Sequence, residues 1–204
     1  MSGGGATAPR PRAHEHVAVF PGSFDPVTFG HLDVIERGRR LFDRVVVAVG
    51  RNPSKDQLFS AAERVEMLQE LVDQMTQAGQ TVAPGAAPVE VAGFDGLTVD
   101  FARRIGATVI LRGIRNLSDL QNEVQQAVTN REVAGLETAF VVAGQSFAYT
   151  SSSLIKQLTA MGTDLAPLRK MVPESVVERL ALKKRQGHPA LARLTATRDP
   201  AGEP

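Results

Sequence analysis

The stretch FPGSFDPVTFGH, residues 20–31, joins an apolar run to a segment with helical periodicity. The run 17–20 has the length of a buried strand, and residues 30–41 have the spacing of an amphipathic helix. A second apolar run at 44–49, rich in valine, completes a strand–helix–strand unit. Gly30 opens the predicted helix, where backbone N–H groups and the helix dipole attract phosphate oxygens and a missing side chain admits a close ligand. The stretch therefore predicts a phosphate site between a strand and a helix.

The alternation of strand-length apolar runs and helical segments continues almost to the end of the chain. Capping-box patterns at Ser60 and at Ser118 mark two helix starts. Further strands are predicted at 89–92, 108–111 and 138–142, and further helices at 60–76, 97–105, 118–133, 154–161 and 173–185. This order predicts an α/β fold, a Rossmann-like doubly wound parallel sheet in a single domain over 16–186. We expect residues 1–15 to be a disordered arm and residues 187–204 a disordered tail.

The composition excludes several classes of function. The 204 residues contain no cysteine, which excludes disulfides, thiolate metal sites and a cysteine nucleophile. The 23 basic and 22 acidic residues nearly balance, so we expect neither a nucleic acid nor a membrane surface as a partner. No apolar run approaches the ~18 residues of a membrane helix. We expect a cytoplasmic protein whose anionic ligands are bound by local groups.

Polar groups that could bind a triphosphate follow the predicted strands, at the edge where parallel sheets bind ligands. They are Ser23 with His31, Lys55, Arg112 with Arg115, and the hydroxyl run Thr150–Ser153. Histidine and arginine can donate hydrogen bonds to phosphate. Each group also has a structural interpretation: His31 could cap its own helix, the arginines could form surface salt bridges, and the hydroxyl run could cap the next helix. Taken singly, these groups leave both interpretations open.

Four segments in the same order resemble bacterial phosphopantetheine adenylyltransferases, which belong to the HxGH nucleotidyltransferase superfamily. Residues 20–31 are similar to the (S/T)FDPxTxGH signature, and Thr28 has the form typical of this family. The other segments are Asn52-Pro53-Ser54-Lys55, Arg112-Gly113-Ile114-Arg115 with Asp119 and Glu123, and residues 150–156. The resemblance runs from about His16 to Leu182.

The resemblance implies adenylyl transfer from ATP to 4′-phosphopantetheine, which gives dephospho-coenzyme A and pyrophosphate in coenzyme A biosynthesis. It implies that His31, Lys55 and Arg112 are catalytic, with His31 as the stabiliser of the transition state. Phosphopantetheine would be held by Ser23, Lys55, Thr98 and Arg112. ATP would be held by Ser23, Phe24, His31, Gly113, Ile114, Arg115, Glu123, Phe147, Ala148, Tyr149, Thr150, Ser151, Ser152 and Ser153. The resemblance also implies Mg²⁺ bound with ATP and without a protein metal site, a homohexamer, and inhibition by coenzyme A.

Several positions depart from the family, and two other functions remain as alternatives. Asn122 stands where the family usually has tyrosine, Phe20 stands where tyrosine is common, and Thr98 stands where methionine is common. The first alternative is another HxGH-type nucleotidyltransferase with a different phosphorylated acceptor, such as glycerol phosphate or nicotinate mononucleotide. The second is a nucleotide-binding sensor without turnover, which would not need His31, Lys55 and Arg112 together. No G-x-G-x-x-G follows a strand and no P-loop occurs, which argues against a dehydrogenase and a P-loop enzyme.

Overall fold

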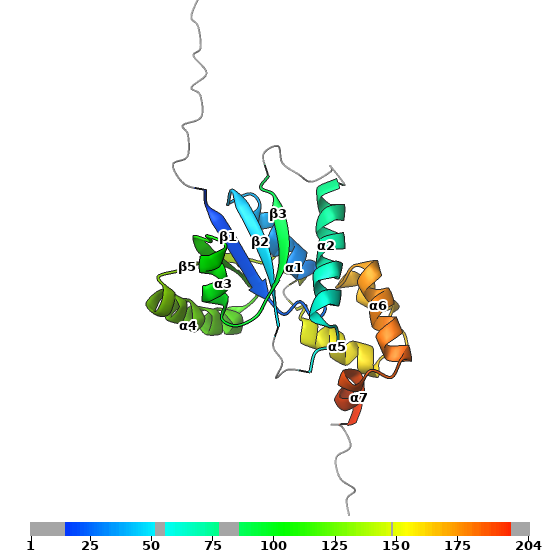
Figure 1. Ribbon diagram of the computed structural model, residues 1–204. Coiled ribbons are helices and arrows are strands. Elements are labelled where there is room, and N and C mark those ends of the chain that lie inside the picture. Colours follow the sequence, from blue (N-terminus) through cyan, green and yellow to red (C-terminus); the bar gives the residue numbers. More distant parts are fainter. Residues whose placement is uncertain (1–14, 52–55, 78–85, 148, 197–204) are drawn as a thin grey trace, which may run out of the picture.

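Valine-rich parallel strands form the centre of the molecule in a computed structural model (Figure 1). The structure describes residues 15–51, 56–77, 86–147 and 149–196. Within these ranges, one five-stranded sheet has the order β3-β2-β1-β4-β5. Its strands are β1 (Val17–Gly22), β2 (Arg44–Gly50), β3 (Val89–Phe94), β4 (Val109–Ile114) and β5 (Glu137–Val142). Each pairing in this sheet is parallel, so the predicted Rossmann-like fold class is confirmed.

Helices cover both faces of the sheet (Figure 1). They are α1 (Phe29–Gly38), α2 (Ala61–Gln77), α3 (Thr98–Arg104), α4 (Leu117–Ala134), α5 (Ser152–Met161), α6 (Glu174–Arg185) and α7 (Pro189–Ala196), with short 3₁₀ turns at Gln145–Phe147 and Ala166–Lys170. Successive side chains of a strand point to opposite faces. Ala18 and Phe20 of β1 therefore join a core with α1, α2, α5 and α6, whereas Val17 and Val19 join a core with α3.

The helix starts show which capping predictions were right. The box at Ser60 is confirmed: the Ser60 N–H donates to Glu63 Oε2 at 2.7 Å, and the Glu63 N–H donates to Ser60 Oγ at 3.2 Å. The box at Ser118 was wrong, because Asn116 is the N-cap and its Oδ1 accepts from the Asp119 N–H at 2.9 Å. Asparagine is an equally good N-cap. The helix therefore begins at Leu117, two residues before the start that Ser118 as N-cap would give.

Strand β4 is longer than predicted. Arg112, Gly113 and Ile114 belong to the strand, paired with Phe140–Val142 of β5, rather than to the loop after it. Pairing with a neighbouring strand supplies backbone hydrogen bonds that the single sequence does not show. Only Arg115 lies directly beyond the strand.

The predicted disordered tail was wrong for residues 189–196, which form helix α7. Leu191 of this helix is buried, and α7 packs against α5. A helix of eight residues is not stable by itself, so its order comes from this packing. The folded part of the chain therefore extends beyond the predicted boundary at residue 186. The predicted arm, 1–15, lies almost entirely outside the described residues.

The strand order places a ligand-binding position between β1 and β4. The chain leaves β1 through α1 toward β2 on one side, and β4 pairs with the other side of β1. Loops at the carboxyl ends of these two strands diverge, and this topological switch point is where open parallel sheets bind ligands. The motif 20–31 and the two arginines of the motif 112–115 meet there.

Candidate active site

His31 lies in the first turn of α1, and the turn before the helix fixes its side chain. Thr28 is the N-cap residue, and its backbone N–H donates to His31 Nδ1 at 3.0 Å. The His31 backbone N–H donates back to Thr28 Oγ1 at 3.4 Å. Because Nδ1 accepts a hydrogen bond, the proton of the neutral ring is on Nε2, which is left as a donor. The capping interpretation of His31 is therefore compatible with a chemical role for the other ring nitrogen.

The surroundings of His31 keep its ring neutral. Burial first, and then the positive charges of Arg115 and Arg112, lower the pKa of His31 from 6.5 to about 4. The ring lies edge-on to Phe24, with 5.0 Å between the ring centroids. Near pH 7, this imidazole offers an N–H donor without an ionised ring.

A cavity of about 200 Å³ opens beside His31. Its lining residues are Phe20, Thr28, Gly30, His31, Val34, Gly113, Arg115, Ala143, Thr150, Ser151, Ser152 and Ser153. Helices α1 and α5 both begin at this cavity, so the positive ends of two helix dipoles lie beside it. A Cβ on Gly113 would lie 2.6 Å from Val34 Cγ2, so glycine is needed for α1 to approach β4 this closely. The arrangement is that of an anion site.

Two hydroxyls of the predicted serine run hold α5 in place. Ser151 is the N-cap of α5, and its Oγ accepts from the Leu154 N–H at 3.1 Å. The Ser152 hydroxyl donates to the Pro26 carbonyl at 2.8 Å, which ties α5 to the loop before α1. The backbone N–H groups of Ser152 and Ser153 in the first turn of α5 therefore remain as donors for a ligand.

Arg112 and Arg115 are each paired with a carboxylate and still keep free donors. Arg112 donates Nε to Glu123 Oε2 at 2.6 Å, Nη2 to the same carboxylate, and Nη1 to a carbonyl of β1 at 2.9 Å. Arg115 donates Nε and Nη2 to Asp119 at 2.7 and 3.0 Å, and Nη1 to a backbone carbonyl at 2.7 Å. A guanidinium has five N–H groups, so these bonds to described residues leave two on each arginine. A salt bridge and a phosphate contact can therefore coexist at each position.

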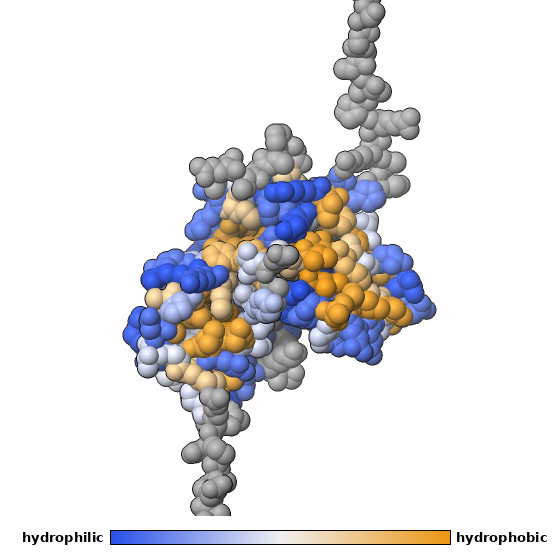
Figure 2. Space-filling model, turned by 180° about the vertical axis from the view of Figure 1, so that it is seen from behind, coloured by the Kyte–Doolittle hydropathy of each residue, from blue (hydrophilic) through white to orange (hydrophobic). Residues whose placement is uncertain are grey.

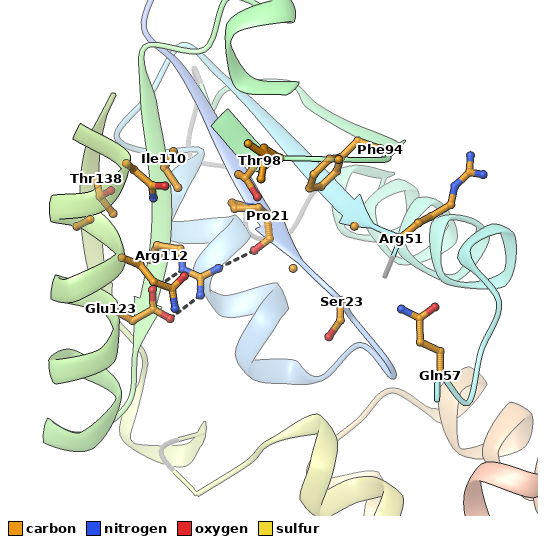
Figure 3. A pocket seen from close by; sticks show the side chains of 17 residues that line it. Pro21, Ser23, Arg51, Gln57, Phe94, Thr98, Ile110, Arg112, Glu123 and Thr138 are labelled. Carbon is orange, nitrogen blue, oxygen red and sulfur yellow. Dashed lines mark hydrogen bonds and ion pairs between the residues drawn. The ribbon is translucent and has the colours of Figure 1, made fainter. Parts of the chain in front are cut away.

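A second cavity, of about 680 Å³, has the volume of a small-molecule site. Figure 3 shows Arg112 and Glu123 on one side of it and Arg51 and Gln57 on the other. The other lining residues are Pro21, Gly22, Ser23, Gly50, Phe94, Gly96, Leu97, Thr98, Ile110, Gln126, Ala127, Asn130 and Thr138.

The two cavities adjoin the same two strands. Phe20 of β1 and Gly113 of β4 line the smaller cavity, and the adjacent residues Pro21 and Arg112 line the larger one. Ligands in the two cavities would therefore both lie beside the switch point, at neighbouring residues of β1 and β4. This arrangement suits a reaction between two bound molecules.

Arg64 supports the larger cavity, and the sequence analysis did not identify it. Its side chain is fully buried, and Nη1 donates to the carbonyls of Ser23 at 2.6 Å and Gly50 at 3.0 Å. Nη2 donates to Gln57 Oε1 at 2.7 Å, so one guanidinium holds three lining residues of the cavity. The available signal was an arginine on the apolar face of α2, four residues before the buried Leu68.

Asp25 ties the signature loop to two helices. Its carboxylate accepts from the N–H groups of Leu58 and Phe59 at 3.0 and 2.8 Å, just before α2. Lys156 of α5 donates to the same carboxylate at 3.0 Å. Asp25 is buried, so these three bonds satisfy a charge that water does not reach.

The predicted site residues separate between the two cavities. Ser23, Thr98, Arg112 and Glu123 line the larger one, although Glu123 was predicted to hold ATP. The predicted ATP residues at the smaller one are His31, Gly113, Arg115 and the run Thr150–Ser153.

Four other predicted residues line neither cavity. Phe24 is buried beneath His31, with a left-handed φ of 48°. Ile114 is half-buried in β4, the ring of Phe147 packs against α1, and Tyr149 is 89% exposed. Lys55 and Ala148 lie outside the described residues. Asn122, one of the departures from the family pattern, is exposed and also lines neither cavity.

Neither a metal cluster nor a membrane helix occurs in the part of the chain that the structure describes. No three His, Asp or Glu side chains there come together as metal ligands. No helix there has the length and apolar character needed to cross a membrane.

Comparison with known proteins identifies the class and the family of this chain. Residues 19–158 match the family model described as cytidylyltransferase-like. The fold resembles that of the nicotinic acid mononucleotide adenylyltransferase of Plasmodium falciparum, with a TM-score of 0.58 at 12% identity over 83% of this chain and 96% of that chain. The chain is therefore an enzyme of the cytidylyltransferase-like nucleotidyltransferase class.

Closer relatives define the family within this class. The chain is 47% identical to a phosphopantetheine adenylyltransferase of Gloeobacter violaceus, over 80% of this chain and 94% of that protein. It is 42% identical to the enzyme of the same name from Caldanaerobacter subterraneus subsp. tengcongensis, over 82% of this chain and 96% of that protein. The chain belongs to the phosphopantetheine adenylyltransferase family.

Proposed function

We propose that this enzyme transfers the adenylyl group of ATP to the phosphate of 4′-phosphopantetheine, giving dephospho-coenzyme A and pyrophosphate. The observation that carries the proposal is the pair of adjoining cavities at the switch point, with the neutral His31 and Arg115 at the smaller and Arg112 at the larger. Family membership supports the same pair of substrates. In this proposal, the triphosphate lies in the smaller cavity and the acceptor in the larger one.

The reaction joins an acceptor oxygen to the α-phosphorus of ATP. The acceptor phosphate is largely a dianion near pH 7, because its second pKa is about 6, so no general base is needed. As its oxygen bonds to the α-phosphorus, the bond from that phosphorus to the bridging oxygen breaks and pyrophosphate leaves. Catalysis then consists of positioning and charge stabilisation.

The residues of the two cavities have separate parts in this reaction. His31 Nε2–H, the free N–H groups of Arg115 and the first turn of α5 would stabilise negative charge on the triphosphate. Arg112 and Ser23 would hold the acceptor phosphate, and the family resemblance adds Lys55 to them.

We propose that Mg²⁺ enters with ATP as part of that substrate. The carboxylates of Asp25, Asp119 and Glu123 are each already paired with a lysine or arginine. An ion held mainly by phosphate oxygens and water fits this donor set, since Mg²⁺ commonly keeps several waters. The ion would neutralise charge on the triphosphate.

The test supplies ATP, Mg²⁺ and phosphopantetheine and follows pyrophosphate release together with dephospho-coenzyme A by mass spectrometry. We expect both products in equal amounts. Parallel reactions with glycerol phosphate and with nicotinate mononucleotide should give no product. Turnover with either of these and none with phosphopantetheine would contradict the proposed acceptor, and no turnover with any of the three would favour a sensor.

We also propose that the chain assembles as a homo-oligomer, a hexamer by its family resemblance. Helix α4 has no buried residue, and Leu117 and Val133 on it are 84% and 62% exposed. The neighbouring β5 is an edge strand on which Val142 is 70% exposed. Hydrophobic side chains gather on the right of Figure 2, the side of α4 and β5. Such a surface is typical of subunit contacts.

Light scattering after size-exclusion chromatography tests this assembly. A hexamer has six times the chain mass of 21.8 kDa. A monomer at micromolar concentration would contradict the proposal.

Two further properties follow from the proposed substrates. Coenzyme A carries the same pantetheine arm as the acceptor, so we propose that it competes for the larger cavity. It should raise the apparent KM for phosphopantetheine, and a KM unaffected by coenzyme A would exclude this competition.

We propose a cytoplasmic location because ATP is made and kept there.

A further inference from the structure

The side-chain amide of Gln57 has one satisfied atom and one unsatisfied atom. Gln57 Oε1 accepts from Arg64 Nη2 at 2.7 Å. A guanidinium can only donate, so the oxygen must face Arg64 and the NH₂ group must point elsewhere. Gln57 Nε2 is buried and has no hydrogen-bond partner among the described residues. Figure 3 shows this nitrogen on the side of Gln57 that faces Ser23.

Arg64 fixes this orientation before any ligand arrives. Its guanidinium also donates to the carbonyls of Ser23, Gly50 and Phe59 at 2.6, 3.0 and 3.1 Å. It therefore joins the ends of β1 and β2 to the segment that carries Gln57. Turning the Gln57 amide over would place its NH₂ against the arginine and lose the bond. The donor is thus held in one direction by a buried group.

A buried donor without a partner is rare in folded proteins and indicates a missing acceptor. Gln57, Ser23 and Arg51 line the same part of the larger cavity. The charged residues of the lining are two arginines, Arg51 and Arg112, and one glutamate, Glu123. Each arginine is paired with a carboxylate, but a guanidinium has five N–H groups, so the lining still retains donors suited to an anion.

We propose that Gln57 Nε2–H donates a hydrogen bond to the phosphate of the acceptor substrate and holds this phosphate beside Ser23. Gln57 is then a substrate-positioning residue, and Arg64 positions Gln57. The inference rests on the proposed function, because it needs a phosphorylated acceptor in the larger cavity. It assigns a specific donor to the phosphate end of that acceptor.

The substitution Gln57→Glu separates this role from a structural one. Glutamate keeps an oxygen for Arg64, and it replaces the donor with a negative charge. We expect the KM for phosphopantetheine to rise on the order of 10-fold to 100-fold, because a charge-assisted bond is lost and two anions face each other. The KM for ATP should stay within about twofold, and the melting temperature should not fall because the Arg64 contact is kept.

Two further variants complete the comparison. Gln57→Met removes both polar atoms without adding a charge, and we expect a KM increase for phosphopantetheine of about 10-fold with a lower melting temperature. Gln74→Glu makes the same chemical change as Gln57→Glu at an exposed position of α2 and should leave both KM values unchanged. If Gln57→Glu folds poorly, Gln57→Met still tests the donor.

Pantetheine, which lacks the phosphate, identifies the group that Gln57 contacts. As a competitive inhibitor, it should bind the wild type and Gln57→Glu equally. If Gln57→Glu bound pantetheine and phosphopantetheine with an equal loss of affinity, Gln57 would contact the pantetheine arm instead. An unchanged KM for phosphopantetheine in both Gln57 variants would also overturn the inference. Failure of the proposed function is a separate result, because it would appear as a wild type that makes no dephospho-coenzyme A.

Discussion

The two cavities at the switch point differ in how completely the fold satisfies their polar atoms. At the smaller cavity, Thr28 orients His31, and the hydroxyls of Ser151 and Ser152 are bonded to the backbone. At the larger cavity, Gln57 Nε2 and Thr138 Oγ1 are buried without partners among the described residues. The smaller cavity, where we propose the nucleotide, therefore has its side-chain hydroxyls bonded by the fold, whereas the larger cavity, where we propose the acceptor, has buried side-chain polar atoms without a partner among the described residues.

Of the changes proposed here, replacement of His31 by alanine should have the largest effect on turnover. It removes the oriented Nε2–H donor from the smaller cavity, and we expect kcat to fall on the order of 10²–10³. The KM for phosphopantetheine should change little, because its cavity is untouched. His16→Ala, at an exposed histidine, is the matched control. Normal turnover by His31→Ala would exclude the proposed role.

The two arginines should affect different substrates. Arg112→Met should raise the KM for phosphopantetheine, and Arg115→Met should raise the KM for ATP, each by about 10-fold to 100-fold, because each removes charge-assisted bonds from one cavity. Steady-state kinetics with one substrate saturating and the other varied measures both values. Equal effects on both substrates in both variants would show that the cavities do not divide the substrates.

Ser151→Ala should have a smaller effect, mainly on stability. It removes the N-cap of α5, and we expect the free energy of unfolding to fall by about 1 kcal/mol in urea denaturation. The KM for ATP should change less than about threefold, because the backbone N–H groups of α5 remain. A large KM increase with unchanged stability would show that this hydroxyl contacts the nucleotide.

The charge of His31 should not change between pH 8 and pH 5.5. Its pKa is about 4 in the folded protein against 6.5 for the ordinary group. Between pH 6.5 and pH 4 the unfolded chain binds this proton and the folded protein does not. The contribution of His31 to the free energy of unfolding is therefore complete above pH 6.5 and is lost as the pH falls toward 4. Nitrogen NMR should show a neutral ring with its proton on Nε2 throughout that range. Titration of His31 near pH 6.5 would contradict the neutral donor.

The sequence by itself determined the fold class and the motifs that meet at the switch point. The period of the apolar residues predicts strands and helices, and their alternation predicts a parallel sheet with loops at one edge. The resemblance of residues 20–31 to the family signature is confirmed at the level of the family. These features are local in the chain, so a single sequence records them.

Tertiary packing decided the features that depend on distant partners. Pairing with β5 extended β4 to Ile114, which places Arg112 in the strand, and packing on α5 ordered α7. Only the folded chain shows that Arg64 holds Ser23, 41 residues away, and that its bond turns the Gln57 amide toward the cavity. A buried arginine and an unsatisfied amide have no local pattern, because their roles depend on groups that folding brings together.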